Sequence, residues 1–283
     1  MKRNLFKLIC LGFSAFVSTS TFAADCPSGN IATSSALTCT KAADSFGVTL
    51  YEIGLCSSTP TVPATGAAYS TSNCQVIYTN SSGAQVSAGA TQTLTGGTSQ
   101  IPQAGTYNYG YAVFKNEISV QGSATFATTV NSRGTSVTSG TTCVTTATAV
   151  SVSAISPSMS TVPYACNTGA TQGAMTVTVD TLATNGSFLA TKHYTSSDYA
   201  ALGSDSLDVY LIDTSNQLSA SGSVRKMMGI QQFASPVVIN SSSSSLDVGF
   251  TKSTALSVIV TPTGGTPSVL LVPAIPNVKI SGH

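Results

Sequence analysis

The chain has 283 residues, of which 42% are hydrophobic and only 7% are charged, and its formal net charge is +1. Typical soluble domains carry about 25% charged residues. No basic stretch is available to neutralise nucleic-acid phosphates, which excludes nucleic acid as a partner. The hydrophobic content argues against intrinsic disorder. Abundant Ser, Thr, Ala, Gly and Val favour β-sheets with a hydroxylated outer face.

The chain begins with the features of a secretory signal peptide. Basic residues at positions 2 and 3 precede an apolar run over 5–17, and small residues follow at Thr21 and Ala23. We predict cleavage after Ala23, so that residues 1–23 are removed and the protein is secreted, to the extracellular space or the surface of a bacterium. The apolar run is shorter than the roughly 18 residues that span a bilayer, so a signal anchor is the lesser alternative and the mature chain is expected to have no membrane span.

Removal of this leader takes away Cys10 and leaves an even number of cysteines, which in an exported chain predicts disulfides. The six are Cys26, Cys39, Cys56, Cys74, Cys143 and Cys166. Their spacing favours three sequential loops, 26–39, 56–74 and 143–166, although sequence alone leaves 15 connectivities open. Each loop of roughly 14 to 24 residues would stabilise the fold by about 3 kcal/mol. A zinc site is the weaker alternative, because the chain has no C-x-x-C and only two histidines.

Residues 45–56 read SFGVTLYEIGLC. From Gly47 the segment resembles the processing site of type IV prepilins, G-F-T-L-I-E. A prepilin has that Gly at the end of a short basic leader, followed by about 20 apolar residues in a helix. Here the motif lies well inside the mature chain, and Pro60 and Pro63 would interrupt a helix. The segment is therefore predicted to be a β-strand, with Cys56 placed to join its end to the next strand by a disulfide.

Alternating apolar and polar residues predict further strands along the chain. Four pairs of such runs flank short polar breaks, which we interpret as hairpin turns at 80–83, 115–116, 185–186 and 263–266. A lone strand is expected at 206–213, and one or two helical turns at 196–202. The stripe of Tyr107, Tyr109 and Tyr111 is expected to pack across strands on the core side. A sugar-stacking platform is the alternative.

These signals predict an all-β fold: one or two disulfide-stapled antiparallel β-sandwich domains, immunoglobulin-like or jelly-roll-like, following the signal peptide. A Thr-, Ser- and Gly-rich stretch near residue 140 divides the strand-rich chain. We therefore expect an N-terminal β-sandwich domain over 24–140 and a C-terminal β-rich domain over 141–283.

The residues that carry chemistry are few. His193 and the terminal His283 are the only imidazoles, and the acidic side chains of Asp198, Asp205, Asp208 and Asp213 lie close together in sequence. A calcium site built from the first three of these aspartates is conceivable, but its spacing matches no known calcium loop. We expect no catalytic residues, no metal and no cofactor, and we predict that the protein is not an enzyme.

An exported, charge-poor and hydroxyl-rich β protein is typical of extracellular assemblies. The expected function is a structural subunit of a filament, surface layer or biofilm matrix, which self-assembles into a homopolymer through β-strand edges. The alternative is a monomeric cell-surface adhesin or carbohydrate-binding module that recognises surface glycans. The apolar segment 253–280 is expected to form a core hairpin, with donation of a strand to a neighbouring subunit as the alternative.

Overall fold

The computed structural model describes residues 24–88, 94, 96–151, 161–182, 189–196, 202–241, 246–250, 252–274 and 278–282. The predicted leader, the 185–186 turn, most of the expected helical turn at 196–202, Asp198 and His283 lie outside these residues. The described part is all β, with one short 3-10 turn at Ser221–Ser223. Among the described residues, no helix is long and apolar enough to cross a membrane.

The strands form two large sheets and one small one. The seven-stranded sheet contains, in spatial order, β1 (Ala24–Asp25), β2 (Leu37–Lys41), β16 (Leu256–Thr261), β17 (Ser268–Pro273), β7 (Ser123–Ser132), β8 (Ser139–Thr145) and β10 (Tyr164–Ala165). The path of the nine-stranded sheet is β12 (Thr191–Tyr194), β13 (Ser206–Ile212), β14 (Lys226–Ile239), β6 (Gly105–Gln121), β3 (Ser45–Cys56), β4 (Cys74–Ser87) and β5 (Thr98–Ser99). Off this path, β11 (Met175–Thr178) pairs with β6 and with β9 (Ala149–Ser151), and β15 (Leu246–Phe250) pairs separately with β18 (Val278–Gly282).

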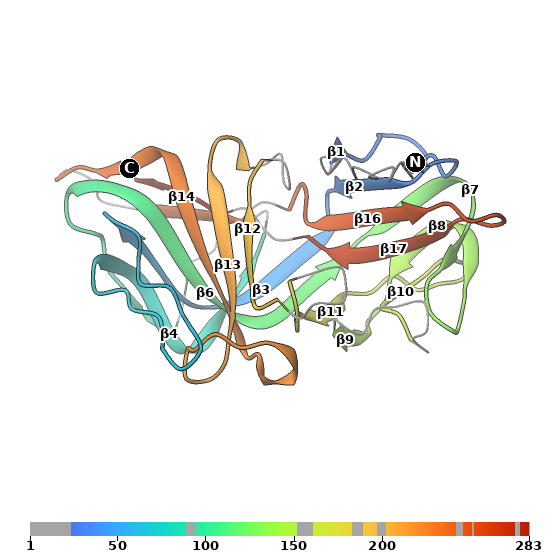
Figure 1. Ribbon diagram of the computed structural model, residues 1–283. Helices are drawn as coiled ribbons and strands as arrows, with labels where there is room; N and C mark the ends of the chain where they lie inside the picture. The colour runs from blue at the N-terminus through green and yellow to red at the C-terminus, as the bar shows by residue number, and fades with distance from the viewer. Residues whose placement is uncertain are drawn as a thin grey trace, which may run out of the picture.

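The two large sheets lie side by side in an elongated molecule (Figure 1), with the nine-stranded sheet on the left and the seven-stranded sheet on the right. Most pairs are antiparallel, but β1–β2, β7–β17 and β9–β11 are parallel. The sheets are therefore mixed, whereas the sequence predicts antiparallel ones. Each parallel contact covers only two or three residues, too short a run to leave the near-continuous apolar signature of a buried parallel strand.

The hairpin expected at Lys115–Asn116 is absent, and this prediction was wrong. β6 runs unbroken from Gly105 to Gln121, and only Gly122 separates it from β7. β3 pairs with β6 on both sides of the polar break, with Val48 opposite Ile118 and Leu50 opposite Phe114. Between these pairs a single residue of β3, Thr49, thus faces three of β6, 115–117, so the polar residues form a β-bulge.

At 80–83 too, the structure has a bulge where the sequence predicts a turn. β4 continues through these residues from Cys74 to Ser87, and the predicted hairpin is again wrong. Leu50 faces Ala84 while Glu52 faces Thr79, so the intervening residues of β4 bulge outward. Asn80 Oδ1 accepts a hydrogen bond from Ser82 N at 2.9 Å, and Gly83 takes a φ of 79°. The residues that favour a turn are present, but the parts of β4 before and after them both pair with β3.

Other sequence predictions have mixed outcomes. The strand at 45–56, the strand at 206–212 and the hairpin around 263–266 are confirmed. The arms expected to pair across 185–186 instead pair with other strands: β11 with β6 and β9, and β12 with β13. Among the described residues, a bond from Leu182 N to Leu189 O, 2.8 Å long, and one from Leu189 N to Thr181 Oγ1, 3.1 Å long, join the arms.

The main apolar core draws on both large sheets. Leu50 and Val120 come from the nine-stranded sheet, and Leu256, Val258 and Leu271 from the C-terminal hairpin; all five are fully buried. The hairpin β16–β17 is thus a core element, as expected. The division into domains 24–140 and 141–283 stays a prediction about independent folding. In the structure, strands from both sides of residue 140 pair in both large sheets, β2 with β16 and β6 with β14.

Asn116, in the bulge of β6, marks the point where the strand changes partner. Up to Lys115 this edge of β6 pairs with β14, and from Ile118 it pairs with β11. The buried Asn116 side chain donates to Val179 O at 3.0 Å and accepts from Val179 N at 2.9 Å, as a backbone unit of a strand would. It therefore completes the ladder where the two partner strands meet.

Asn116→Ala should lower the free energy of unfolding by roughly 1–3 kcal/mol, because it leaves the amide and carbonyl of Val179 without partners in a poorly hydrated position. Urea denaturation followed by circular dichroism measures this change. Asn108→Ala is the matched control in the same strand: its side chain is exposed and donates a single bond to Ser57 O at 2.8 Å. Equal losses for the two variants would contradict the role given to Asn116.

Candidate functional site

The six predicted cysteines form three disulfides, Cys26–Cys39, Cys56–Cys74 and Cys143–Cys166. These are the sequential pairs favoured by the spacing. The first ties the segment after β1 to β2, and the third ties β8 to the residue after β10. The second joins residues that lie directly opposite each other at the ends of β3 and β4. Each disulfide therefore fixes two neighbouring strands to each other.

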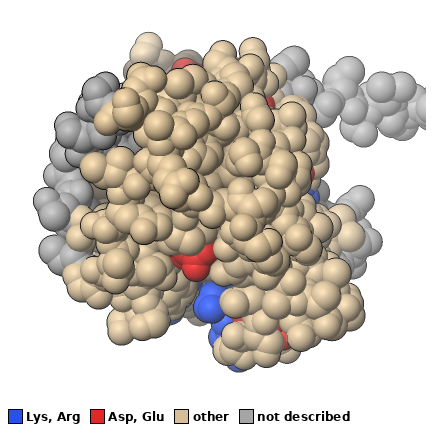
Figure 2. Space-filling model, turned by 90° about the vertical axis from the view of Figure 1, so that its left-hand side faces the viewer, with Lys and Arg blue, Asp and Glu red and all other residues tan. Residues whose placement is uncertain are grey.

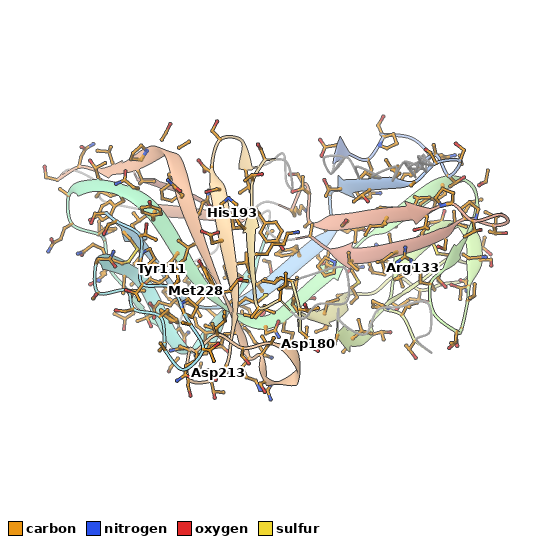
Figure 3. All side chains as sticks on the ribbon, in the orientation of Figure 1. Tyr111, Arg133, Asp180, His193, Asp213 and Met228 are labelled. Atoms are coloured by element: carbon orange, nitrogen blue, oxygen red, sulfur yellow. A yellow bond between two sulfur atoms is a disulfide. The ribbon has the colours of Figure 1, made fainter. Side chains whose placement is uncertain are left out.

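Of the acidic residues singled out in the sequence, the three that the structure describes, Asp205, Asp208 and Asp213, do not come together. Asp205 accepts bonds from Gln231 Nε2 at 2.7 Å and Ala234 N at 2.9 Å, where β14 is irregular. Asp208 Oδ1 lies 2.7 Å from Nδ1 of the exposed His193. Asp213, at the lower edge in Figure 3, accepts from Ser215 N and Gln217 N and closes a turn. Within the described ranges, no three His, Cys, Asp or Glu side chains group in a way that would hold a metal.

A second apolar cluster covers the outer face of the nine-stranded sheet, distinct from the main core. Its buried centre contains Tyr111 and Met228, which Figure 3 shows near each other on β6 and β14. The half-buried residues around it include four further tyrosines: Tyr51, Tyr69, Tyr109 and Tyr210. We call this set of five tyrosines the tyrosine face. The rings of the four half-buried tyrosines are partly accessible to solvent.

Tyr111 organises the centre of this face. Its hydroxyl donates to Glu52 Oε1 at 2.6 Å, and its ring lies over Gly54 of the neighbouring strand. A Cβ on Gly54 would come within 2.5 Å of the ring and 2.6 Å of Gln75 O, so only glycine permits this approach. Burial, with the Glu52 carboxylate in addition, raises the pKa of Tyr111 well above its ordinary range. The tyrosine stays neutral and holds the carboxylate in place.

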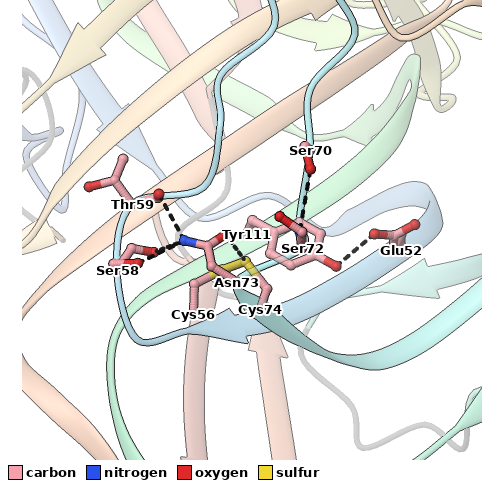
Figure 4. The surroundings of a disulfide bond; sticks show 9 residues. All are labelled: Glu52, Cys56, Ser58, Thr59, Ser70, Ser72, Asn73, Cys74 and Tyr111. Atoms are coloured by element: carbon pink, nitrogen blue, oxygen red, sulfur yellow. Dashed lines mark hydrogen bonds between the residues drawn. A yellow bond between two sulfur atoms is a disulfide. The ribbon is translucent and has the colours of Figure 1, made fainter.

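The segment between Cys56 and Cys74 folds over the tyrosine face and brings Tyr69 to it. Figure 4 shows how its base is closed: beside the disulfide, Asn73 Nδ2 donates to Ser58 O, Ser58 Oγ and Thr59 O at 2.8–3.0 Å. Farther out, Tyr69 N donates to Asn216 O at 3.3 Å. Burial and the charge of Glu52 raise the pKa of Tyr69 to about 12. The excursion is thus held at its base by the disulfide and Asn73, and farther out by the bond from Tyr69 to Asn216.

Two lysines border the face at its lower end. Lys226 of β14 lies directly opposite Lys115 of β6 in the register. Lys226 Nζ is 2.9 Å from Asn216 Oδ1 and 5.6 Å from the centre of the Tyr51 ring. Lys115 Nζ is 2.7 Å from Glu117 Oε2. Figure 2 views the molecule from the left-hand side of Figure 1 and shows a small acidic spot beside a small basic one on an otherwise almost uncharged surface.

The expectation for the tyrosine stripe holds only in part. Tyr107 and Tyr111 are buried, but Tyr107 packs in the main core whereas Tyr111 belongs to the outer cluster. Tyr109 is half-buried at the margin of the outer cluster. The stripe therefore contributes to both packing and the accessible face. No local sequence pattern identifies Tyr51 or Lys226 as part of this face, because their positions depend on strand register.

A separate cavity of about 750 Å³ lies in the seven-stranded half, between the segment after β1 and the ends of β2 and β7. Hydroxyl side chains line much of it, among them Ser28, Thr125 and Ser253, together with one carboxylate and one ammonium group, Asp25 and Lys41. Its size is in the range of small-molecule sites. The opposed charges and scattered hydroxyls favour no particular ligand class, so the tyrosine face is the better-defined candidate site.

No known protein family, no curated protein and no solved structure matches the chain. The site is therefore interpreted from its own geometry.

Alkaline titration should reveal the buried tyrosines. Burial raises the pKa of Tyr69, Tyr164 and Tyr210 from 10.0 to about 12, with Asp208 adding to the effect at Tyr210. Because the folded-state pKa exceeds the unfolded one, the stability that these groups contribute is intact below pH 10 and is lost as the pH rises toward 12. We expect tyrosinate absorbance to lag in the folded chain relative to the urea-unfolded chain. Ionisation of all ten tyrosines near pH 10 with a native circular dichroism spectrum would contradict this prediction.

Proposed function

We propose that the protein is exported after removal of residues 1–23 and acts outside the cell as a β-sandwich binding protein, of the adhesin or carbohydrate-binding type. Three disulfides are consistent with an oxidising compartment. The wider nine-stranded sheet supplies the binding surface in this proposal, and the disulfides hold the strands that carry it. Asp213 closes a turn, Asp205 bonds to Gln231 and Asp208 pairs with His193. Because these acidic side chains do not act together, their placement supports a binding function over a catalytic one.

The tyrosine face is the observation that carries this proposal. An extended outer sheet face normally alternates with the core face and carries polar residues. Here it carries a second apolar cluster ringed by half-buried tyrosines, covered in part by a disulfide-closed excursion. A sugar ring has an apolar C–H face bordered by hydroxyl groups. Tyrosine matches both features, because its ring packs on the C–H face and its hydroxyl forms hydrogen bonds.

A glycan array probed with the full mature chain tests the proposal. We expect binding to a subset of glycans, and we expect Tyr210→Ala to weaken it about tenfold or more, in line with the roughly 0.5–1.5 kcal/mol of an aromatic contact plus its buried area. Tyr210→Phe, which keeps the ring, should retain most of the affinity. Failure of the folded wild-type chain to bind any neutral or acidic glycan would overturn the proposal.

A structural subunit of a filament, surface layer or biofilm matrix is the second candidate, and one feature of the seven-stranded sheet favours it. β17 pairs with β7 only through Ser268–Asn131 and Val269–Ser132. In the pairing of the described residues, the rest of β17, from Leu270 to Pro273, has a strand partner on one side only, β16. Because Leu270 and Leu271 are buried, β-augmentation by another copy at this edge would require the segments that cover it to move aside. The charge-poor surface also reduces the cost of desolvation on close packing.

Size-exclusion chromatography and negative-stain microscopy distinguish the two candidates. A self-assembling subunit should form filaments or sheets in a concentration-dependent manner, because association through strand edges follows mass action. A monomeric adhesin should elute as a single discrete species at every concentration. Filaments would replace the monomeric account, whereas monomers that bind glycans would exclude assembly as the function.

A further inference from the structure

We propose that Lys226 and Lys115 form an anion-binding position beside Tyr51, and that it takes the carboxylate of an acidic sugar. This inference rests on the proposed glycan-binding function and names its ligand class. It is carried by the placement of the two lysines in the register of the sheet, by their existing partners and by the neighbouring aromatic ring.

The two lysines face each other across adjacent antiparallel strands. Like charges at directly opposite positions destabilise a sheet, since their Cβ atoms lie about 5 Å apart. The chain has only 11 Lys and Arg residues, and three of these precede residue 24. Two of the remaining eight thus occupy one cross-strand pair. Because lysine is scarce in this chain, a cross-strand pair of lysines is not explained by composition, and we infer that the pair has a function.

The internal partners leave positive charge at this position. Lys115 is paired with Glu117, whose carboxylate is also the main cause of the raised pKa of Lys115. Lys226 bonds to the neutral amide oxygen of Asn216, and no ion pair between described residues includes it. Glu52 and Asp213 keep their negative charge, but their carboxylates accept hydrogen bonds from Tyr111 and from main-chain amides, and neither forms an ion pair with Lys226 among the described residues.

The position is also held in place before a ligand arrives. Asn216 has a φ of 62°, in the left-handed region, and its turn is closed by Asp213, which accepts from Gln217 N at 3.0 Å. Its main-chain oxygen is fixed by Tyr69 N. Asn216 therefore orients Lys226 Nζ, which has three N–H donors and uses one for this bond. The other donors remain for an anion.

The neighbouring rings make a carboxylated sugar the fitting ligand. Tyr51 of β3 is near both lysines: Lys226 Nζ is 5.6 Å from the centre of its ring, and its electrostatic interaction contributes to the raised pKa of Lys115. Tyr210 is one position diagonal to Lys226, opposite Met228 on the same face. An ammonium group that pairs with a carboxylate, next to rings that pack on the C–H face of the same sugar, matches a hexuronic acid residue.

The test uses the full mature chain and a galacturonate hexasaccharide, with its methyl ester as the matched uncharged ligand. Titration calorimetry should give an affinity for the acid about 10- to 100-fold above that for the ester, the range of a charge-assisted hydrogen bond. Lys226→Gln should remove most of this difference and flatten its dependence on salt. Lys252→Gln, in the seven-stranded half, is the control and should change neither.

Each result has a distinct meaning. Equal affinity for acid and ester, or equal effects of Lys226→Gln and Lys252→Gln, would overturn the anion site while leaving glycan binding intact. Absence of binding to both ligands and to every glycan on the array would instead remove the proposed function. Without ligand, Lys226→Gln should keep or raise the melting temperature at low salt, because it relieves the repulsion between the lysines. A fall would make Lys226 a structural residue and contradict the assignment.

Discussion

β6 must satisfy the hydrogen-bonding groups on both of its edges over its 17 residues, and it does so by recruiting three neighbours. β3 covers one edge, while β14 and β11 share the other. Beyond Gln121 the same extended chain becomes β7 of the other large sheet. Gly122 lies at the passage, where a Cβ would come within 2.9 Å of the end of the Leu256 side chain in the core. The arrangement of both sheets follows from this single continuous segment.

Local patterning predicts strands well in this chain and their ends poorly. The alternation around 45–56 and the run of apolar residues in the C-terminal hairpin suffice to identify those elements, and cysteine spacing suffices for the disulfides. The polar residues at 80–83 and 115–116 carry ordinary turn chemistry, but β3 pairs on both sides of each break and turns them into bulges. Whether such a signal becomes a turn or a bulge depends on a third strand, which no local window contains.

The candidate site shows the same limit. Tyrosine alternation along β6 points to aromatic packing, and Tyr111 is indeed buried. Lys115 and Lys226, in contrast, are separated by more than a hundred residues and come together only through the register of β6 and β14. The register of β6 and β14 is regular from Tyr109 to Lys115 and shifts only between Gln232 and Val237. Sequence reasoning cannot obtain the lysine pair without first knowing that these two strands are neighbours and in which register.

The tyrosine face is complete only in a compartment where the Cys56–Cys74 disulfide can form. This disulfide closes the base of the excursion that carries Tyr69, and Asn73 adds its three contacts beside the bond. In a reducing cytoplasm this closure is missing, and the ordering of the excursion must be supplied by weaker contacts alone. In the proposed exported protein, oxidation outside the cytoplasm would therefore be a maturation step, and the tyrosine face would be completed only after export.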